Sequence, residues 1–222
     1  MTFNQLKWTS TRNPFTRNRP LQLMIFLFII FFGLMAISPT NRPQWLVYNF
    51  LLIVVILTLI FTYKWFRFSN FSYLLMLIFF CLHTYAAHYT YEGTPLDQWL
   101  QTNFHTNRSY YDRIVHFAFG FFFYFPFIEI LKLKVKLRGI WLYMMPILVI
   151  LALSALFEIL EMLGALVAGP EGEEKFIGMQ GDIYDTQKDM AVGFLGGIIS
   201  IGIPLLMNWN RDNTFAISDE TH

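Results

Sequence analysis

Apolar residues run along the chain in six long stretches that short polar segments separate. The stretches cover residues 21–38, 45–63, 72–90, 112–131, 140–164 and 187–207. The hydrocarbon core of a bilayer is about 30 Å thick, and roughly 20 apolar residues cross it as a helix. Because lipid offers no partners to backbone N–H and C=O groups, each stretch must be helical. The pattern predicts an all-α, polytopic transmembrane helical bundle of about six spans, forming one integral membrane domain over residues 1–222.

Composition supports a membrane protein and excludes an ordinary soluble domain. Hydrophobic residues make up 55% of the chain and charged residues 14%, whereas soluble domains carry about a quarter charged residues. The single cysteine, Cys81, lies inside an apolar stretch, so the chain has neither an internal disulfide nor a CxxC motif. The first 20 residues are polar and basic, and we expect the apolar stretch after them to act as an uncleaved signal anchor.

The distribution of lysine and arginine predicts the orientation. If both termini face the cytoplasm, eleven of the 16 basic residues lie on that side. An excess of basic residues in short cytoplasmic loops is the usual signal of topology. We therefore predict an N-in, C-in, multi-pass protein of the bacterial cell inner membrane, with membrane lipids as its partners. Topology alone explains the basic loops, so no nucleic-acid partner is expected.

Acidic and imidazole side chains gather at the outer ends of four spans. A charged side chain in a bilayer costs at least about 2.5 kcal/mol, and such groups usually face the bundle interior or water. In chain order the residues are His83, His88, Asp112, His116, Glu158, Glu161, Asp182, Asp185 and Asp189. Because alternate spans run in opposite directions, this clustering requires opposite ends of successive segments. We expect one outward-facing polar site, formed by the third to sixth spans.

Helical spacing supports this convergence. Asp112 and His116 are four residues apart, and Glu158 and Glu161 are three apart, so each pair shares a helix face. The two histidines of the third span are five residues apart, about 140° around a helix, so only one of them is expected to point inward.

Helix capping is a simpler interpretation of some of these acids. Asp112 would be a first-turn acid of its span, and the segment from Thr186 to Asp189 fits a capping box. Capping does not explain Glu158 and Glu161, because they lie near the carboxyl end of their helix, where the macrodipole disfavours anions. Those two carboxylates need a cation, a proton or a basic partner.

Two chemistries suit the set. As acids and bases, the catalytic candidates are Asp112, His116, Glu158, Glu161, Asp185 and Asp189. Carboxylates together with imidazole also suit a divalent metal such as zinc, manganese or iron. In that case His83, His88 and Asp182 are candidate ligands beside the catalytic set. The sequence contains no HExxH, GxSxG, P-loop or GxGxxG motif that would assign a reaction.

Four segments carry a resemblance to known proteins: HTYAAHYTYEG (83–93), YDRIVHFAFGF (111–121), FEILEML (157–163) and GDIYDTQKDMAVGFLGG (181–197). They resemble the YjdF-like family of bacterial inner-membrane proteins, over essentially the whole chain. This resemblance implies a location in the cell and not an activity.

The second half of the chain is also similar to VanZ-like proteins. Asp112, Arg113, His116 and Phe117 resemble the D-[KR]-x-x-H-F pattern of that group. Glu158 or Glu161 resembles its later glutamate, and Asp185, Asp189 and Gly193 resemble its D-x-x-x-N-x-x-G segment, with Asp189 where Asn is usual. VanZ-like proteins are linked to glycopeptide resistance and envelope processes, so this resemblance implies an envelope substrate.

The leading hypothesis is a metal-assisted hydrolase or transferase acting on a lipid-linked or envelope substrate, with residues 165–186 as a lid. A proton-coupled carrier and a non-catalytic envelope assembly factor stay open as alternatives. A carrier usually shows repeated halves and a path near the midplane, and the sequence shows neither. The first two spans carry few polar groups and are expected to be scaffold. Gly193 and Gly197 form a GxxxG surface for close helix packing.

Reporter fusions test the orientation. A periplasm-dependent reporter is expected to be active when fused after Thr102 and inactive when fused after Lys134 or Asn213, because the basic loops stay in the cytoplasm. Enzyme activity of each fusion in intact cells, with immunoblotting as the control for expression, is the measurement. The reverse pattern would refute the outward placement of the acidic residues.

Overall fold

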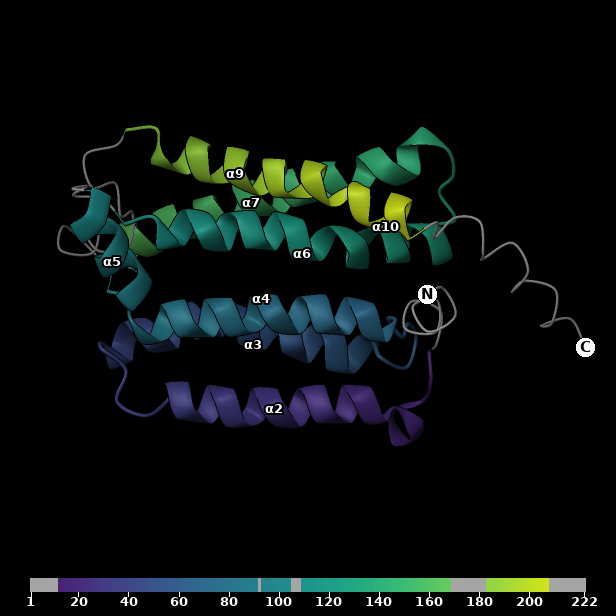
Figure 1. The fold of residues 1–222 in the computed structure, drawn as a ribbon, viewed down its shortest axis with the longest axis horizontal. Coiled ribbons are helices and arrows are strands. Elements are labelled where there is room, and N and C mark those ends of the chain that lie inside the picture. Colours follow the sequence, from purple (N-terminus) through teal and green to yellow (C-terminus); the bar gives the residue numbers. More distant parts are fainter. Residues whose placement is uncertain (1–11, 92, 105–108, 169–182, 208–222) are drawn as a thin grey trace, which may run out of the picture.

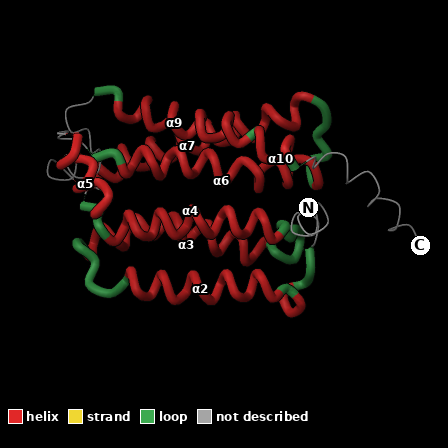
Figure 2. Tube along the Cα trace, viewed as in Figure 1, coloured by secondary structure: helices red, strands yellow, loops and turns green. Residues whose placement is uncertain are grey.

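The computed structural model describes residues 12–91, 93–104, 109–168 and 183–207, and these residues are helices joined by loops (Figure 2). The elements are η1 (Phe15–Arg17), α2 (Arg19–Met35), α3 (Arg42–Thr62), α4 (Asn70–His88), α5 (Pro95–Phe104), α6 (Tyr111–Leu133), α7 (Ile140–Ala168), α9 (Asp185–Ser200) and α10 (Gly202–Leu206). No strand occurs in these ranges. The predicted all-α class is confirmed.

Five helical segments are long and apolar enough to cross a membrane. They are α3, α4, α6, the part of α7 up to Leu166, and α9 continued by α10. The apolar helix α2 is shorter, with 17 residues, and rises about 25 Å. With α2 included, the six predicted spans are found, and their boundaries differ from the predicted ones by a few residues.

Side-chain caps explain why three helices begin earlier than predicted. Asn18, Asn41 and Ser69 each accept a hydrogen bond from the backbone N–H three residues further on, at 3.1–3.3 Å. Such caps satisfy N–H groups that have no partner within the helix. Pro20 and Pro43 stand in the first positions of α2 and α3, where a missing N–H costs nothing.

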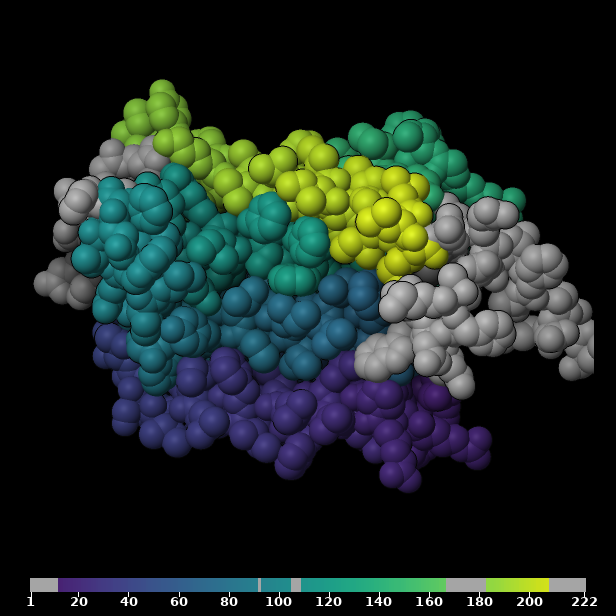
Figure 3. Space-filling view, viewed as in Figure 1, coloured from purple at the N-terminus to yellow at the C-terminus, as the bar shows by residue number. Residues whose placement is uncertain are grey.

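Helix α5 was not predicted, because its segment was taken as a polar connection. The hydroxyl of Thr94 accepts a hydrogen bond from the N–H of Asp97 at 3.1 Å. The Asp97 carboxylate is fully buried and accepts a hydrogen bond from the N–H of Tyr110 at 2.7 Å. The sequence from Thr94 to Asp97 is therefore the signal that was missed, because it follows the capping-box pattern. In Figure 3, α5 covers one end of the bundle at the boundary between its halves.

The last predicted span is interrupted at Ile201, between α9 and α10. Pro204 has no N–H to donate to the carbonyl of Ser200, four residues before it. The break therefore follows from the proline, although α9 and α10 together still provide a membrane span.

The helices form two halves that meet at one seam (Figure 1). One half contains α2, α3 and α4, and the other contains α6, α7 and α9. Helix α4 packs on α6, whereas α3 packs chiefly on α4, and α7 packs on α6 and α9. Helix α5 lies at one end of the bundle, and η1 and α10 lie at the other. We call the α5 end the outer end, following the predicted orientation.

Helices α6 and α9 approach each other so closely that their glycines are required. A methyl group at Gly120 would lie 1.9 Å from the carbonyl oxygen of Gly193. One at Gly196 would lie 2.3 Å from the carbonyl oxygen of Phe117. The GxxxG surface of α9 therefore packs within the chain, as its sequence predicted.

A buried carboxylate holds the halves together at the inner end. Glu129 of α6 is fully buried, and one of its oxygens accepts hydrogen bonds from Arg12 at 2.5 Å and from the N–H of Ser69 at 2.8 Å. The other oxygen accepts hydrogen bonds from the hydroxyls of Ser69, at 3.0 Å, and Ser72. A buried charge is tolerated when such partners compensate its lost hydration. Glu129 was not among the predicted polar groups, although a lone acid in an apolar span is a signal of a buried partner.

Alanine substitutions test the glycine contact. Gly120→Ala should lower the thermal midpoint of the protein in detergent, because the methyl group meets backbone that cannot move independently; overpacking typically costs about 1–3 kcal/mol. Gly33→Ala on α2 is the matched control, because nothing lies within 4 Å of its added methyl. The Gly33→Ala variant should have an unchanged or higher thermal midpoint, with a gain of up to about 1 kcal/mol in the free energy of unfolding. Equal midpoints for the two variants would contradict the close α6–α9 packing.

Candidate functional site

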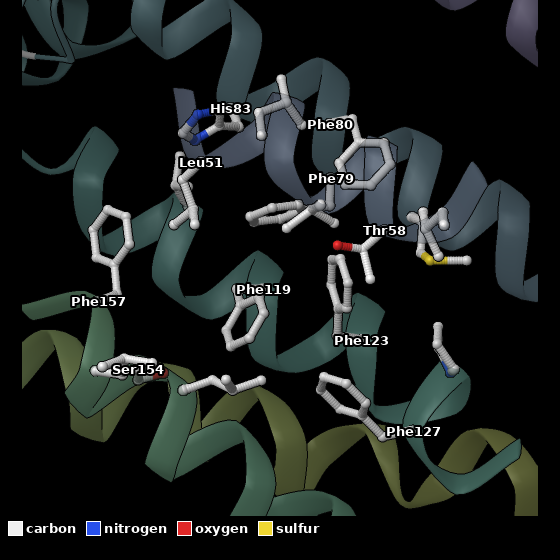
Figure 4. Close-up of a pocket in the computed structure, with 18 of the residues that line it drawn as sticks. Leu51, Thr58, Phe79, Phe80, His83, Phe119, Phe123, Phe127, Ser154 and Phe157 are labelled. Carbon is white, nitrogen blue, oxygen red and sulfur yellow. The ribbon is translucent and has the colours of Figure 1, made fainter. Parts of the chain in front are cut away.

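A long cavity of about 730 Å³ lies between the two halves of the bundle (Figure 4). Side chains of α3, α4, α6 and α7 line it, and we call it the apolar groove. Its aromatic wall consists of Phe79, Phe80, Phe119, Phe123, Phe127 and Phe157. Asp112 and His116 line the groove toward the outer end, and Trp65 and Lys134 line it toward the inner end.

The second span contributes directly to this groove. Leu51, Val55 and Thr58 of α3 line it beside the phenylalanine side chains of α4 and α6. The expectation that the first two spans serve only as scaffold is therefore wrong for α3. Helix α3 leaves a space between itself and the α4–α6 seam. Its apolar face therefore forms one wall of the groove.

At the outer end of the groove, one imidazole lies between two carboxylates. The Nε2 atom of His116 is 3.3 Å from Oε1 of Glu158 and 3.7 Å from Oδ1 of Asp112. The side chains of His116 and Glu158 are 6% and 8% exposed, whereas that of Asp112 is 34% exposed. Helical spacing places Asp112 and His116 on one face of α6, and packing of α7 on α6 brings in Glu158.

The two acids of α9 share a different cation. Nη2 of Arg113 is 3.3 Å from Oδ1 of Asp185, and Nε of Arg113 is 3.6 Å from Oδ1 of Asp189. Both carboxylates are nearly buried. Arg113 is a nearby basic group that Glu158 and Glu161 could have used, but the structure places it with Asp185 and Asp189. Arg113 therefore joins α6 to α9 beside the histidine.

The predicted capping box from Thr186 to Asp189 is not formed, whereas Asp112 lies in the first turn of α6, as predicted. Helix α9 begins at Asp185, and its N-cap, Tyr184, makes no side-chain capping bond. Thr186 lies inside the helix and its side chain forms a hydrogen bond with Glu158. At the start of α6 the N-cap is Tyr110, again without a side-chain capping bond. Asp112 also lies 3.7 Å from His116 on its own helix, and Asp189 lies 3.6 Å from Arg113 on α6.

Glu161 adds to the crowding of negative charge. It lies close enough to Asp112, Glu158 and Asp189 to interact with them electrostatically. We call the whole set the outer cluster: Asp112, Arg113, His116, Glu158, Glu161, Asp185 and Asp189. The structure therefore brings together all six catalytic candidates, with Arg113 among them. Whether they are catalytic stays a prediction.

His83 lines the groove, and both of its ring nitrogens are engaged. The hydroxyl of Tyr91 donates to Nδ1 at 2.7 Å, and Nε2–H donates to the carbonyl oxygen of Tyr48 at 3.0 Å. Burial raises the pKa of the Tyr91 phenol well above its ordinary value, and the carboxylates of Asp112 and Glu161 raise it further. The phenol therefore stays protonated as a donor, and His83 joins α4 to α3.

The other metal-ligand candidates lie elsewhere. His88 points away from the groove, with Nδ1 2.8 Å from the carbonyl oxygen of Met35 on α2. Only one histidine of this span faces inward, as the spacing predicted. Asp182 and most of the suggested lid, residues 165–186, lie outside the described residues. Over the described ranges, no three His, Cys, Asp or Glu side chains form a group that could hold a metal ion, and the metal stays a prediction.

Ser154 was missed by the sequence analysis. Its side chain lines the groove and is 2% exposed, and its Oγ has no hydrogen-bond partner among the described residues. A methyl group on Gly193 would lie 2.9 Å from this oxygen, so the glycine leaves room for it. The available signal was spacing, since Ser154 precedes Glu158 by one helical turn.

Charge-neutralising variants separate strained acids from structural ones. Glu158→Gln and Glu161→Gln should leave the thermal midpoint in detergent unchanged or raise it, because each removes repulsion within the outer cluster. Arg113→Gln should lower it, since Asp185 and Asp189 would lose their cation; breaking a buried pair costs about 3–5 kcal/mol. If the two glutamine variants unfold as readily as the arginine variant, the glutamates brace the fold instead.

Comparison with known proteins agrees with the helical membrane architecture. The chain is 29% identical to the inner membrane protein YjdF of Escherichia coli K12 over 194 residues, which is 87% of this chain and 90% of that protein. No solved structure matches. The resemblance to VanZ-like proteins stays a prediction. A family described as predicted membrane proteins, DUF2238, matches residues 20–210, and the chain belongs to this family.

Proposed function

We propose that this protein is an inner-membrane hydrolase or transferase that binds a lipid-linked substrate, with the lipid chain in the apolar groove and the head group at the outer cluster. One observation carries the proposal: Asp112, His116 and Ser154 line the same cavity as the phenylalanine wall. Binding sites for amphiphiles combine apolar walls with a few polar groups that orient the ligand. The inner-membrane relative in Escherichia coli supports the location.

The chemistry that fits is proton transfer by His116. Its Nε2 faces Glu158 and Asp112, and these carboxylates hold the ring in place at the mouth of the groove. In hydrolysis or group transfer, imidazole takes a proton from the attacking water or hydroxyl and returns one to the leaving oxygen. A positioned acid–base group of this kind contributes about 10²–10⁴-fold in rate. Asp112 is the more exposed carboxylate and is the better placed to meet water.

The lining of the groove favours an enzyme over a proton-coupled carrier. Toward the inner end from His83 and His116, the described lining residues include no carboxylate and no imidazole. A proton relay across the membrane needs such groups along its path. The apolar wall is suited to an alkyl or prenyl chain that enters sideways from the bilayer. A metal-assisted reaction would use the same carboxylates, but the acid–base form needs only the groups already placed together.

Blocking the groove tests the proposal. Thr58→Trp should reduce the amount of amphiphile that the purified protein retains, because Thr58 lines the groove and the larger side chain would fill it. Leu57→Trp is the matched control: Leu57 is 45% exposed and is not part of the lining. Mass spectrometry of lipids retained by the purified protein measures binding, and rescue of the deletion phenotype measures function.

A third variant separates catalysis from binding. His116→Gln should retain the amphiphile and fail to rescue the deletion strain. Retention of the same amphiphile by Thr58→Trp would refute the groove as its site. Full rescue by His116→Gln would refute the acid–base role and favour the assembly factor.

A further inference from the structure

We infer that the outer cluster recognises a positively charged, ammonium-bearing head group. The assignment of this group to a lipid rests on the proposed function, because the apolar groove supplies the binding site for its chain. The charge of the head group is a separate question, and the contacts of the cluster bear on it directly.

Among the described residues, carboxylates outnumber basic side chains at the mouth of the groove. Arg113 lies between Asp185 and Asp189 and pairs with both. Asp112 and Glu158 share His116, which carries at most one positive charge. An anionic head group would therefore meet repulsion, whereas a cation would be attracted. The apolar walls strengthen both effects, because low-dielectric surroundings screen charges less than water does.

One buried polar atom at this end has no partner. Ser154 Oγ makes no hydrogen bond within the described part of the chain, and its residue is 2% exposed. Glu158 lies one turn further along the same face of α7, and its Oε1 is 3.3 Å from Nε2 of His116 without forming a hydrogen bond. Roughly 90% or more of buried polar groups in proteins have a hydrogen-bond partner, so the serine hydroxyl beside the groove indicates a ligand.

The hydrogen-bonding capacity of the polar side chains at this end favours a ligand that donates hydrogen bonds. An ionised carboxylate only accepts hydrogen bonds, and a serine hydroxyl accepts them as well. A primary ammonium provides three N–H donors and one positive charge, which suits the Ser154 hydroxyl and the carboxylates of Asp112 and Glu158. A phosphate could accept a hydrogen bond from Ser154, but its negative charge would be repelled by the two carboxylates.

An aromatic ring completes the environment. Phe157 lines the groove, and its ring centroid is 5.5 Å from that of His116. The face of an aromatic ring attracts a cation within about 6 Å. The ligand is therefore an amine-headed amphiphile, such as a lipid with an aminoalkyl head group. A soluble amine has the same head-group chemistry but lacks the chain.

Matched photo-crosslinkable probes test the inference on the full-length protein in neutral maltoside micelles. Three amphiphiles share one diazirine-bearing chain and end in a primary amine, a hydroxyl or a phosphate. Peptide mass spectrometry measures labelling of the groove segment around Phe119. The amine probe should label about tenfold more than the phosphate probe at equal concentration, equivalent to about 1.4 kcal/mol.

Variants show where the preference arises. Glu158→Gln and Ser154→Ala should each reduce amine labelling severalfold, while labelling by the hydroxyl probe stays the same. Lys134→Gln, at the inner end of the groove, is the charge-changing control and should leave the preference intact. Ser154→Ala removes one atom only, so it keeps the test usable if a charge variant fails to fold.

The outcomes separate the two proposals. Equal labelling by all three probes, or preference for the phosphate, overturns the ammonium inference and leaves the lipid groove standing. Absence of groove labelling above other peptides, by any probe, overturns the lipid groove. Propylamine is the soluble competitor: weak competition supports a lipid source for the ammonium. Competition as strong as that of the long-chain amine supports the ammonium site and overturns the role of the chain.

Discussion

The backbone contact between α6 and α9 is the constraint on which the outer cluster depends. Gly120 and the glycines of α9 allow the two helices to meet without side chains between them. The short separation between α6 and α9 brings Arg113 of α6 within reach of Asp185 and Asp189 of α9. A larger residue at the contact would push α9 outward and leave three charges near the bilayer without their partners, which membrane burial makes costly.

The two ends of the bundle each contain a buried carboxylate, but its surroundings differ between them. At the inner end, Glu129 is completely buried and accepts hydrogen bonds from Arg12, Ser69 and Ser72. At the outer end, Oε1 of Glu158 lies 3.3 Å from Nε2 of His116 but forms no hydrogen bond among the described residues. Full satisfaction is what stability requires of a buried charge. Incomplete satisfaction beside a cavity is more typical of a functional site.

The groove arises from the way the halves are joined. Because α4 and α6 provide the seam, α3 and α7 diverge on one side of it and expose apolar faces to a common space. The phenylalanine side chains on α4 and α6 line this space (Figure 4). A head-group site at one end and an apolar channel behind it are the two parts that an amphiphile requires.

The sequence by itself determined the class of fold, the spans and the end of the bundle where polar groups gather, because bilayer thickness and backbone hydrogen bonding allow few alternatives. It also determined that Asp112 and His116 share a face, since that depends only on helical spacing. Tertiary packing decided the pairings: Arg113 with the acids of α9, Glu158 with His116, and His83 with Tyr91. The groove was likewise decided by packing, because a cavity is the space that several helices leave between them. No single segment of sequence encodes such a space, so the contribution of α3 and Ser154 became visible only in three dimensions.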